Sequence, residues 1–353
     1  MAGPVLWQVV SFSSLAGWTT DHQGETLAAF RRSCARIMNL SPGSPLDGKL
    51  QGATIYGVAR DWRDACAAAE QVAPGDAAAR AYFEAHFQPV RFATSQTGLF
   101  TGYYEPEMNG ARQRGGIYQT PVLATPPGFK ALREEGRLLP TRAEIEEGAL
   151  NGKAMPIVWL ADPVDAFFLH VQGSGRIRLS DGTTMRLAFA GKNGQPYTSI
   201  GKVLIARGAI APEDVSMQTI RAWLNGHRDE MPGILRQNES YIFFRELGGM
   251  DDALGPLGAE GINLTPGRSL AVDRSEHPLG ALLWLNSVQP SSDNQYLPLQ
   301  RLMVAQDTGT AIKGIQRGDV FWGSGEGPGH IAGLMKSPGE LFALLPRGLV
   351  VRQ

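Results

Sequence analysis

The pattern of apolar residues changes near residue 90. Before that point apolar side chains recur at the spacing of amphipathic helices, which predicts helices over residues 25–39, 58–72 and 76–87, with Asp76 as the N-cap of the third. Beyond it, short runs rich in β-branched and aromatic residues are separated by Gly, Pro and Asp, as is typical of strands and turns. The chain is therefore expected to be mainly β with an N-terminal helical portion.

Two groups of strands are predicted. The first lies between Phe92 and Arg245 and comprises residues 98–104, 117–123, 156–160, 166–172, 176–180 and 184–188. Asp181–Thr183 is a hairpin turn between the last two of these strands, and helices are expected at 198–207 and 217–224. The second group comprises residues 269–272, 280–285, 302–305, 319–322 and 341–345. The even spacing of such short strands suggests a small closed barrel.

Composition narrows the class of protein. The 353 residues are 43% hydrophobic and 19% charged, which is enough apolar matter for a core and excludes wholesale disorder. The formal charge is -1 and no run of five basic residues occurs, so nucleic acid is not an expected partner and a neutral, polyhydroxylated substrate fits better. No stretch approaches the roughly 18 apolar residues of a membrane span, and the chain as given is expected to be soluble.

The chain has two cysteines, Cys34 and Cys66, and no C-x-x-C pair, so neither structural zinc nor thioredoxin chemistry is expected. They could form one disulfide in an exported protein, but two buried, unbonded cysteines on helices is the favoured interpretation. The segment Met1–Trp7 lacks the basic and long apolar regions of an intact signal peptide. A mature chain, or one from which a signal was removed, is therefore expected.

Asp307 and Asp319 are the strongest candidates for chemistry. Asp307 follows an apolar run and Asp319 opens another, and each lies beside a turn. Both carboxylates can therefore converge on one cleft. The neighbours Val320, Phe321 and Trp322 can desolvate Asp319 and raise its pKa, as a general acid requires. The alternative is that both aspartates only cap turns. A single Asp-Thr-Gly element at Asp307 does not make an aspartic protease, which needs two.

The segment Thr101–Pro106 carries two adjacent tyrosines, Tyr103 and Tyr104. Neighbouring side chains in a strand point to opposite faces, so one ring can pack inward while the other lines a groove and stacks on sugar rings. Ordinary burial of both rings is the alternative. The six histidines are scattered and show no metal-binding spacing, so no metal site is predicted.

Taken together, five segments resemble the MltA family of membrane-bound lytic murein transglycosylases. They occur in the family's order between about residues 98 and 346, whereas the first 90 residues add little. The matching segments are Thr101–Pro106; His170–Gly175; Ala190–Gly194 with Ser199–Leu204; Asn238–Phe244; and Asp307–Gly314 followed by Asp319 and Phe321–Gly323.

The resemblance implies an enzyme that cuts the β-1,4 bond between N-acetylmuramic acid and N-acetylglucosamine in peptidoglycan, leaving a 1,6-anhydro-muramyl end. It also implies a fold. Residues 1–104 and 246–353 would form a discontinuous catalytic domain, with N-terminal helices and a double-psi β-barrel. Residues 105–245 would form an inserted, smaller β-barrel domain, with the glycan in the groove between the two.

By the same resemblance Asp319 is the single catalytic residue, acid first and base second, and Asp307 is its orienting or structural partner. Groove-lining positions that would bind substrate are Thr101, Tyr103, Gln172, Gly173, Ser174, Lys192 and Ser240. No metal or organic cofactor is implied. The expected partner is the peptidoglycan glycan strand, bound by a monomer in the periplasm. Members commonly carry a lipid anchor to the outer membrane, but Cys34, the first cysteine, lies in a predicted helix and is no anchor.

Two alternatives remain at this point. Asp307 and Asp319 could act as the carboxylate pair of a peptidoglycan glycoside hydrolase, in which water attacks and a reducing end forms. The chain could also be a glycan-binding module without activity, since small barrels carry many functions.

Overall fold

The computed structural model describes residues 6–50, 55–94, 97–248, 255–291 and 295–350. Most of the N-terminal segment used above, Met1–Val5, lies outside these residues. The chain forms two compact units, each with its own sheet. The first unit comprises Met1–Tyr103, Leu257–Gly323 and Met335–Gln353, and the second comprises Tyr104–Pro256 and Ser324–Leu334.

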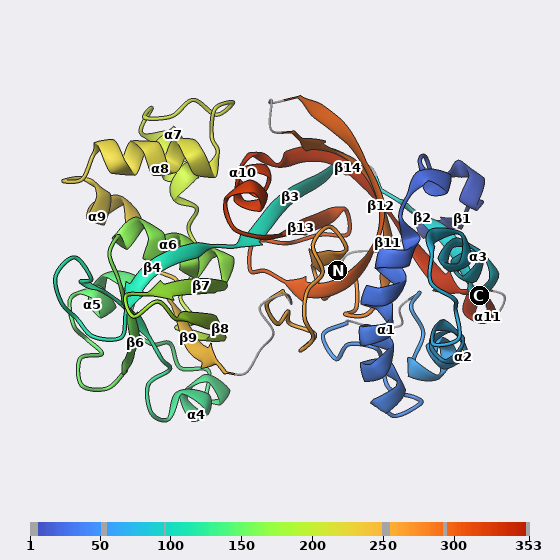
Figure 1. Cartoon of the computed structure of the whole chain (residues 1–353), viewed down its shortest axis with the longest axis horizontal. Coiled ribbons are helices and arrows are strands. Elements are labelled where there is room, and N and C mark those ends of the chain that lie inside the picture. The colour runs from blue at the N-terminus through green and yellow to red at the C-terminus, as the bar shows by residue number, and fades with distance from the viewer. Residues whose placement is uncertain (1–5, 51–54, 95–96, 249–254, 292–294, 351–353) are drawn as a thin grey trace. The chain divides into compact units, whose positions relative to one another are not determined.

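The first unit is built on a closed barrel of six strands (Figure 1). The strands are hydrogen-bonded in the order β14-β11-β12-β10-β13-β3, and β3 pairs again with β14, which closes the ring. In this barrel β10 and β12 run parallel, whereas the pairs β10–β13, β11–β12, β11–β14 and β14–β3 are antiparallel. The strand bounds are Gly98–Glu105 (β3), Ser269–Val272 (β10), Leu282–Pro290 (β11), Tyr296–Thr308 (β12), Arg317–Ser324 (β13) and Lys336–Pro346 (β14). The predicted small barrel is confirmed.

Two further strands, β1 (Leu6–Val9) and β2 (Phe87–Ala93), extend the sheet beyond β14. Three helices pack beside it: α1 (Gln23–Asn39), α2 (Ala59–Ala69) and α3 (Asp76–His86), with α1 against β12 (Figure 1). The predicted N-terminal helices are therefore confirmed. Short helices η1 (Phe12–Ser14), η2 (Trp18–Thr20) and α11 (Arg347–Val350) complete the unit.

Two local predictions in these helices are wrong. Asp76 is the first helical residue of α3 rather than its cap, because its carboxylate instead accepts from the Gly24 N–H at 3.0 Å and contacts His22 Nδ1 at 2.8 Å. Cys34 and Cys66 are joined by a disulfide, with their α-carbons 5.2 Å apart, because α1 and α2 pack side by side. Helix packing, which the spacing of the cysteines does not reveal, brings them together.

The second unit contains a six-stranded sheet in the order β5-β6-β4-β7-β8-β9. Its strands are Glu107–Ala111 (β4), Thr120–Leu123 (β5), Pro156–Leu160 (β6), Ser174–Leu179 (β7), Thr184–Lys192 (β8) and Ile242–Leu247 (β9). The edge strands approach each other at one isolated bridge, Ala124 to Phe244. The antiparallel β7–β8 hairpin turns at Gly182, whose φ is 86°, and confirms the Asp181–Thr183 prediction.

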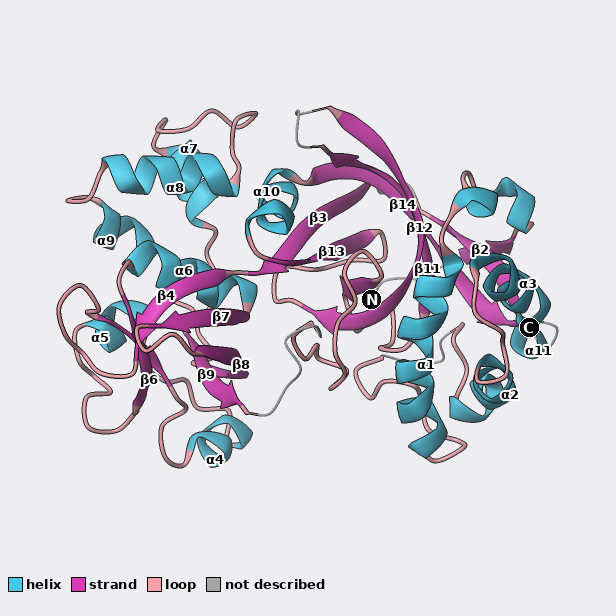
Figure 2. Cartoon of the chain, viewed as in Figure 1, coloured by secondary structure: helices cyan, strands magenta, loops and turns pink. Residues whose placement is uncertain are grey.

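Helices surround the second sheet as well, so the fold is mixed α/β rather than mainly β (Figure 2). Near the expected helices at 198–207 and 217–224 lie α7 (Ile200–Ala206) and α8 (Met217–Gly226). The remaining helices of the unit are α4 (Phe129–Glu134), α5 (Arg142–Glu146), α6 (Pro163–Gln172), α9 (Met231–Leu235) and α10 (Glu326–Leu334).

The helix α6 overturns the predicted strand at 166–172. Asp162 caps it by accepting from the Val164 N–H at 2.9 Å, Pro163 opens it, and Gly173 ends it with φ 78°. One side of α6 packs on the sheet and the other on helices α7–α9, so its middle, Ala166–Leu169, is a continuous apolar run. A helix buried on two sides has no polar face, and its short apolar run resembles a buried strand.

Among the residues that the structure describes, no helix combines the length and the apolar character needed to cross a membrane.

Candidate functional site

Asp319 lies on β13, and its side chain is hydrogen-bonded to a residue of the neighbouring strand β3. Thr101 Oγ1 donates to Asp319 Oδ1 at 2.7 Å. The Asp319 side chain is half-buried, and the apolar neighbours Val320 and Phe321 on the same strand are buried. Thr101, predicted as a substrate-binding residue, thus contacts the predicted catalytic carboxylate directly.

Asp307, near the end of β12, is held by three donors. Tyr103 Oη donates to its Oδ2 at 2.8 Å, and the Ala259 and Thr308 N–H groups each donate to its Oδ1 at 2.9 Å. Three hydrogen bonds fix the orientation of this carboxylate within the first unit. A carboxylate held by three donors fits the orienting or structural role that the resemblance implies for Asp307.

Burial raises the pKa of both carboxyls above the ordinary value of an aspartate. For Asp319, the Arg317 charge and the Thr101 hydrogen bond act against burial and lower the pKa, while the negative charge of Asp307 raises it further. For Asp307, the Ala259, Thr308 and Tyr103 hydrogen bonds oppose burial. The prediction that apolar neighbours raise the pKa of Asp319 is confirmed in direction, and this carboxyl is suited to hold a proton as a general acid.

A small apolar cluster lies beside the two aspartates. Its buried members are Tyr103, Leu264, Ala271, Ile312 and Phe321. The rings of Tyr103 and Phe321 pack with centroids 5.3 Å apart. Tyr103 and Tyr104 are only 9% and 8% exposed, which favours ordinary burial of both rings over one ring lining a groove. Tyr103 contributes its hydroxyl to Asp307 instead of offering a ring face.

The other predicted substrate residues lie in the second unit, at the ends of α6 and of strands β7–β9. Gln172 ends α6, its Oε1 accepting from the Tyr104 N–H at 3.1 Å. Gly173 makes the left-handed turn that follows, and Ser174 opens β7. Lys192 is the last residue of β8 and pairs with Ile242 of β9. Ser240 lies two residues before Ile242 in the chain. These residues therefore form two groups in the second unit: Gln172–Ser174 at the junction of α6 and β7, and Lys192 with Ser240 at the end of β8 and just before β9.

A buried arginine supports the second of these segments. Arg142 donates to the carbonyl oxygens of Asn238 and Ser240, at 3.1 and 2.8 Å, and contacts His170 Nδ1 at 3.1 Å. Burial, together with the nearby arginine charge, holds the pKa of His170 well below its usual range, so this ring is neutral. Sequence reasoning did not single out Arg142, because nothing local marks an arginine as buried.

Arg317 is the residue nearest the chemistry that the sequence prediction missed. Its Nη2 donates to Thr101 Oγ1 at 2.9 Å. The predicted strand at 319–322 begins too late to include Arg317, whereas β13 begins at Arg317, two residues before Asp319, and residues at that spacing in a strand share one face.

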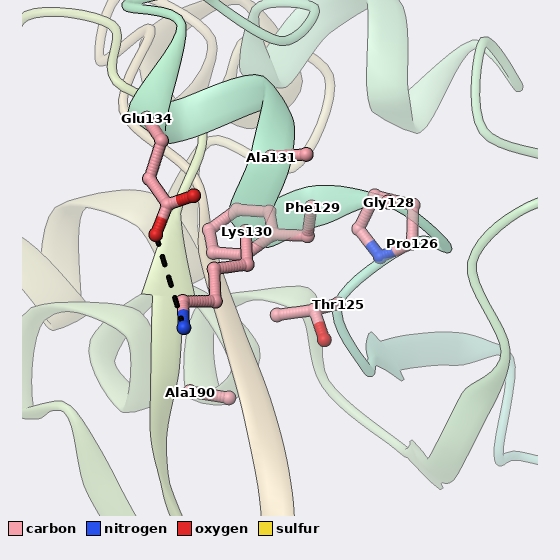
Figure 3. A pocket seen from close by; sticks show the side chains of 8 residues that line it. All are labelled: Thr125, Pro126, Gly128, Phe129, Lys130, Ala131, Glu134 and Ala190. Carbon is pink, nitrogen blue, oxygen red and sulfur yellow. Dashed lines mark ion pairs between the residues drawn. The ribbon is translucent and has the colours of Figure 1, made fainter.

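Two hollows lie away from the aspartates. One, of about 550 Å³, is in the second unit (Figure 3), where Lys130 and Glu134 of α4 lie 3.8 Å apart. The other, of about 520 Å³, is in the first unit, beside Arg268, Arg301 and Trp322. None of the predicted site residues lines either hollow.

Comparison with known proteins identifies the family. Residues 99–245 match the model described as MltA specific insert domain, and residues 268–345 match the 3D domain. The chain is 41% identical over 251 residues to "Membrane-bound lytic murein transglycosylase A" of Escherichia coli (strain K12). That match covers 69% of this chain and 65% of the relative, so it spans somewhat less than two thirds of the curated protein.

Solved structures match over nearly the whole chain. The membrane-bound lytic murein transglycosylase from Agrobacterium tumefaciens superposes with a TM-score of 0.84 at 34% identity, covering 98% of this chain and 99% of that one. The structure of E. coli MltA with bound chitohexaose has a TM-score of 0.73 at 30% identity, covering 96% and 94%. The chain therefore belongs to the MltA family of membrane-bound lytic murein transglycosylases.

Proposed function

We propose that this protein is a lytic transglycosylase that cleaves the MurNAc-β-1,4-GlcNAc bond of peptidoglycan, with Asp319 as its one acid and base. The observation that carries the proposal is the half-buried Asp319 carboxyl, held by the Thr101 hydroxyl at 2.7 Å, in a member of this family. Chitohexaose bound to E. coli MltA supports a glycan ligand for the same fold.

The reaction needs one proton carrier. Protonated Asp319 gives its proton to the glycosidic oxygen, the bond from that oxygen to the anomeric carbon breaks, and the GlcNAc hydroxyl leaves. The muramyl 6-hydroxyl oxygen then bonds to the anomeric carbon, and its proton passes to the Asp319 carboxylate. A 1,6-anhydro ring results and Asp319 regains its acid form. Because the nucleophile belongs to the substrate, no second carboxylate has to activate water.

The surroundings of Asp307 favour this scheme over a carboxylate pair. Three donors already engage its two oxygens, including the buried Tyr103 hydroxyl. A catalytic base must accept a proton from water, and a carboxylate committed to structural donors is poorly placed to do so. We assign Asp307 a structural role in holding Tyr103 and the Ala259 backbone around the site.

The finer features implied by the family are part of the same proposal. The six-stranded barrel is of the double-psi type, and the second sheet is the inserted smaller barrel, with domain limits at residues 104/105 and 245/246. Gln172, Gly173, Ser174, Lys192 and Ser240 bind the glycan. The protein acts as a monomer in the periplasm, and the Cys34–Cys66 disulfide supports an oxidising compartment.

The test is digestion of purified sacculi by the parent protein and by Asp319→Asn, followed by mass spectrometry. The expected soluble product is lighter than the hydrolytic product by one water, about 18 Da. Asp319→Asn should release no fragments while still binding sacculi, and Asp307→Asn should retain measurable turnover. Reducing ends in place of anhydro ends would establish the hydrolase. Binding without turnover in the parent protein would establish the glycan-binding module.

A further inference from the structure

Arg317 is tied to the candidate acid through a second residue. It opens β13 two positions before Asp319, on the same face of the strand. Its Nη2 donates to Thr101 Oγ1 at 2.9 Å, and its Nη1 donates to the Leu99 carbonyl at 3.2 Å and to the Gly318 carbonyl. The guanidinium therefore bridges β13 and β3 and is fixed at several points.

The direction of this hydrogen-bond chain follows from the groups themselves. An arginine has donors only, so Thr101 Oγ1 must accept from Arg317. A threonine hydroxyl has a single hydrogen, and that hydrogen remains available for Asp319 Oδ1, 2.7 Å away. Arg317 therefore orients the Thr101 hydroxyl toward the carboxylate.

We propose that Arg317 is a positioning residue which, through the Thr101 hydroxyl, fixes the orientation of the Asp319 carboxyl. The proposal deepens the proposed function, because it names a residue that adjusts the group assigned to the chemistry. Neither the sequence motifs nor the comparisons assign a role to Arg317.

The charged groups around Asp319 have opposite effects on its pKa. Arg317, on the same strand, lowers the pKa of the Asp319 carboxyl, whereas Asp307, on β12, raises it. Tyr103, on β3, feels both aspartates, and with its burial they raise the pKa of its phenol, so it stays protonated and neutral. Burial lowers the pKa of Arg317 itself, but a guanidinium stays charged in proteins. Arg317 is therefore the positive charge that offsets burial and Asp307.

The direct test measures the Asp319 titration by carboxyl ¹³C NMR, without any substrate. Arg317→Met should move the Asp319 titration to higher pH, while Arg317→Lys, which keeps the charge, should leave it close to that of the parent. The matched control is Arg91→Met, which removes an exposed arginine paired with Glu340 in the same unit. This variant should leave the Asp319 titration unchanged. An Arg317→Met variant that titrates like the parent would overturn the proposal.

Kinetics on sacculi then separate positioning from folding. Arg317→Met should lower kcat by about 10- to 100-fold, with KM little changed, because a slightly misplaced acid costs rate rather than binding. The alkaline limb of its pH profile should move to higher pH. In Arg317→Lys the alkaline limb should return to its position in the parent, because the positive charge is kept. The kcat should recover only in part, because an ammonium does not reproduce the planar, two-point donor geometry of a guanidinium. A kcat loss with an unmoved limb would contradict the proposal.

Thr101→Val and Thr101→Ser test the same hydrogen-bond chain without changing Arg317, so they remain informative if the Arg317 variants fail to fold. The valine variant loses the bridging hydroxyl and should shift the Asp319 titration to higher pH, whereas the serine variant keeps the hydroxyl and should leave the Asp319 titration close to that of the parent. If the parent protein released nothing from sacculi, the proposed function would fail. The NMR titration would still decide the role of Arg317, so the two failures are distinguishable.

Discussion

The Thr101 hydroxyl and the Asp319 carboxylate, 218 residues apart in the sequence, are joined by a hydrogen bond of 2.7 Å. Strands β3 and β13 are neighbours in the closed barrel, although nearly the whole second unit lies between them in the chain. The pairing of β3 with β13 in the barrel therefore determines which groups contact Asp319. The partial burial of the Asp319 carboxyl should in turn affect the stability of the barrel.

Asp319→Asn should stabilise the protein at pH 7. In the folded state burial raises the pKa of Asp319, so the folded protein binds this proton more tightly than the unfolded chain. The stability that this proton contributes is complete below the unfolded pKa of about 3.9 and is lost as pH rises through the folded pKa. An asparagine avoids the burial of a charge. The melting temperature of the variant should exceed that of the parent at pH 7, and the gap should narrow toward pH 4.

The control for that experiment is Asp181→Asn. Hydrogen bonds from Thr183 lower the pKa of the exposed Asp181, the opposite direction, so its loss should bring no stabilisation at pH 7. Equal melting temperatures for the parent and Asp319→Asn across this pH range would contradict the prediction.

Tyr103→Phe should destabilise the first unit by about 1 to 3 kcal/mol, because Oδ2 of the half-buried Asp307 then loses the donor supplied by the Tyr103 hydroxyl. Urea unfolding monitored by fluorescence gives the free energy of unfolding. Tyr296→Phe is the matched control, since Tyr296 is 61% exposed and its hydroxyl can stay hydrated. Equal losses in the two variants would show that the hydroxyl of Tyr103 does not support Asp307.

Glu105→Gln should destabilise the second unit by about 3 to 5 kcal/mol. The Glu105 side chain is fully buried and pairs with Arg176 at 2.7 Å and Arg186 at 3.0 Å. Neutralising Glu105 removes the buried carboxylate charge with which both arginines pair. Glu107→Gln, two residues away, breaks only an exposed pair with Arg178 and should cost under about 1 kcal/mol. Denaturant unfolding compares the two variants, and similar midpoints would show that the buried Glu105 carboxylate contributes no more to stability than the exposed Glu107.

Reduction of the Cys34–Cys66 disulfide should lower stability by about 3 kcal/mol, because the bond closes a segment of 32 residues and restricts the unfolded chain. Thermal unfolding with and without dithiothreitol measures the change. The Cys34→Ser, Cys66→Ser double variant should melt like the reduced parent and be insensitive to the reductant. A parent protein whose melting is unaffected by dithiothreitol would show that the bond is absent or contributes nothing.

Much of the local structure follows from the sequence. The amphipathic spacing over 25–39 and the Asp-Gly turn at 181–183 each determine an element, because helical periodicity and turn propensity are encoded by neighbouring residues. The apolar run at 166–172 was misassigned because a helix buried on both sides carries no polar face to mark its period. Capping by Asp162 and Gly173 was the available signal.

Local sequence was enough to predict the N-terminal helices, most of the barrel strands, the family motifs and the direction in which burial moves the pKa of Asp319. The sequence did not reveal that Cys34 bonds to Cys66, that Tyr103 donates to Asp307, or that Arg317 contacts Asp319 through Thr101. The difference lies in the sequence separation over which each signal acts. Periodicity and propensity act over a few residues, whereas these contacts join strands and helices whose pairing is fixed by the packing of the whole core.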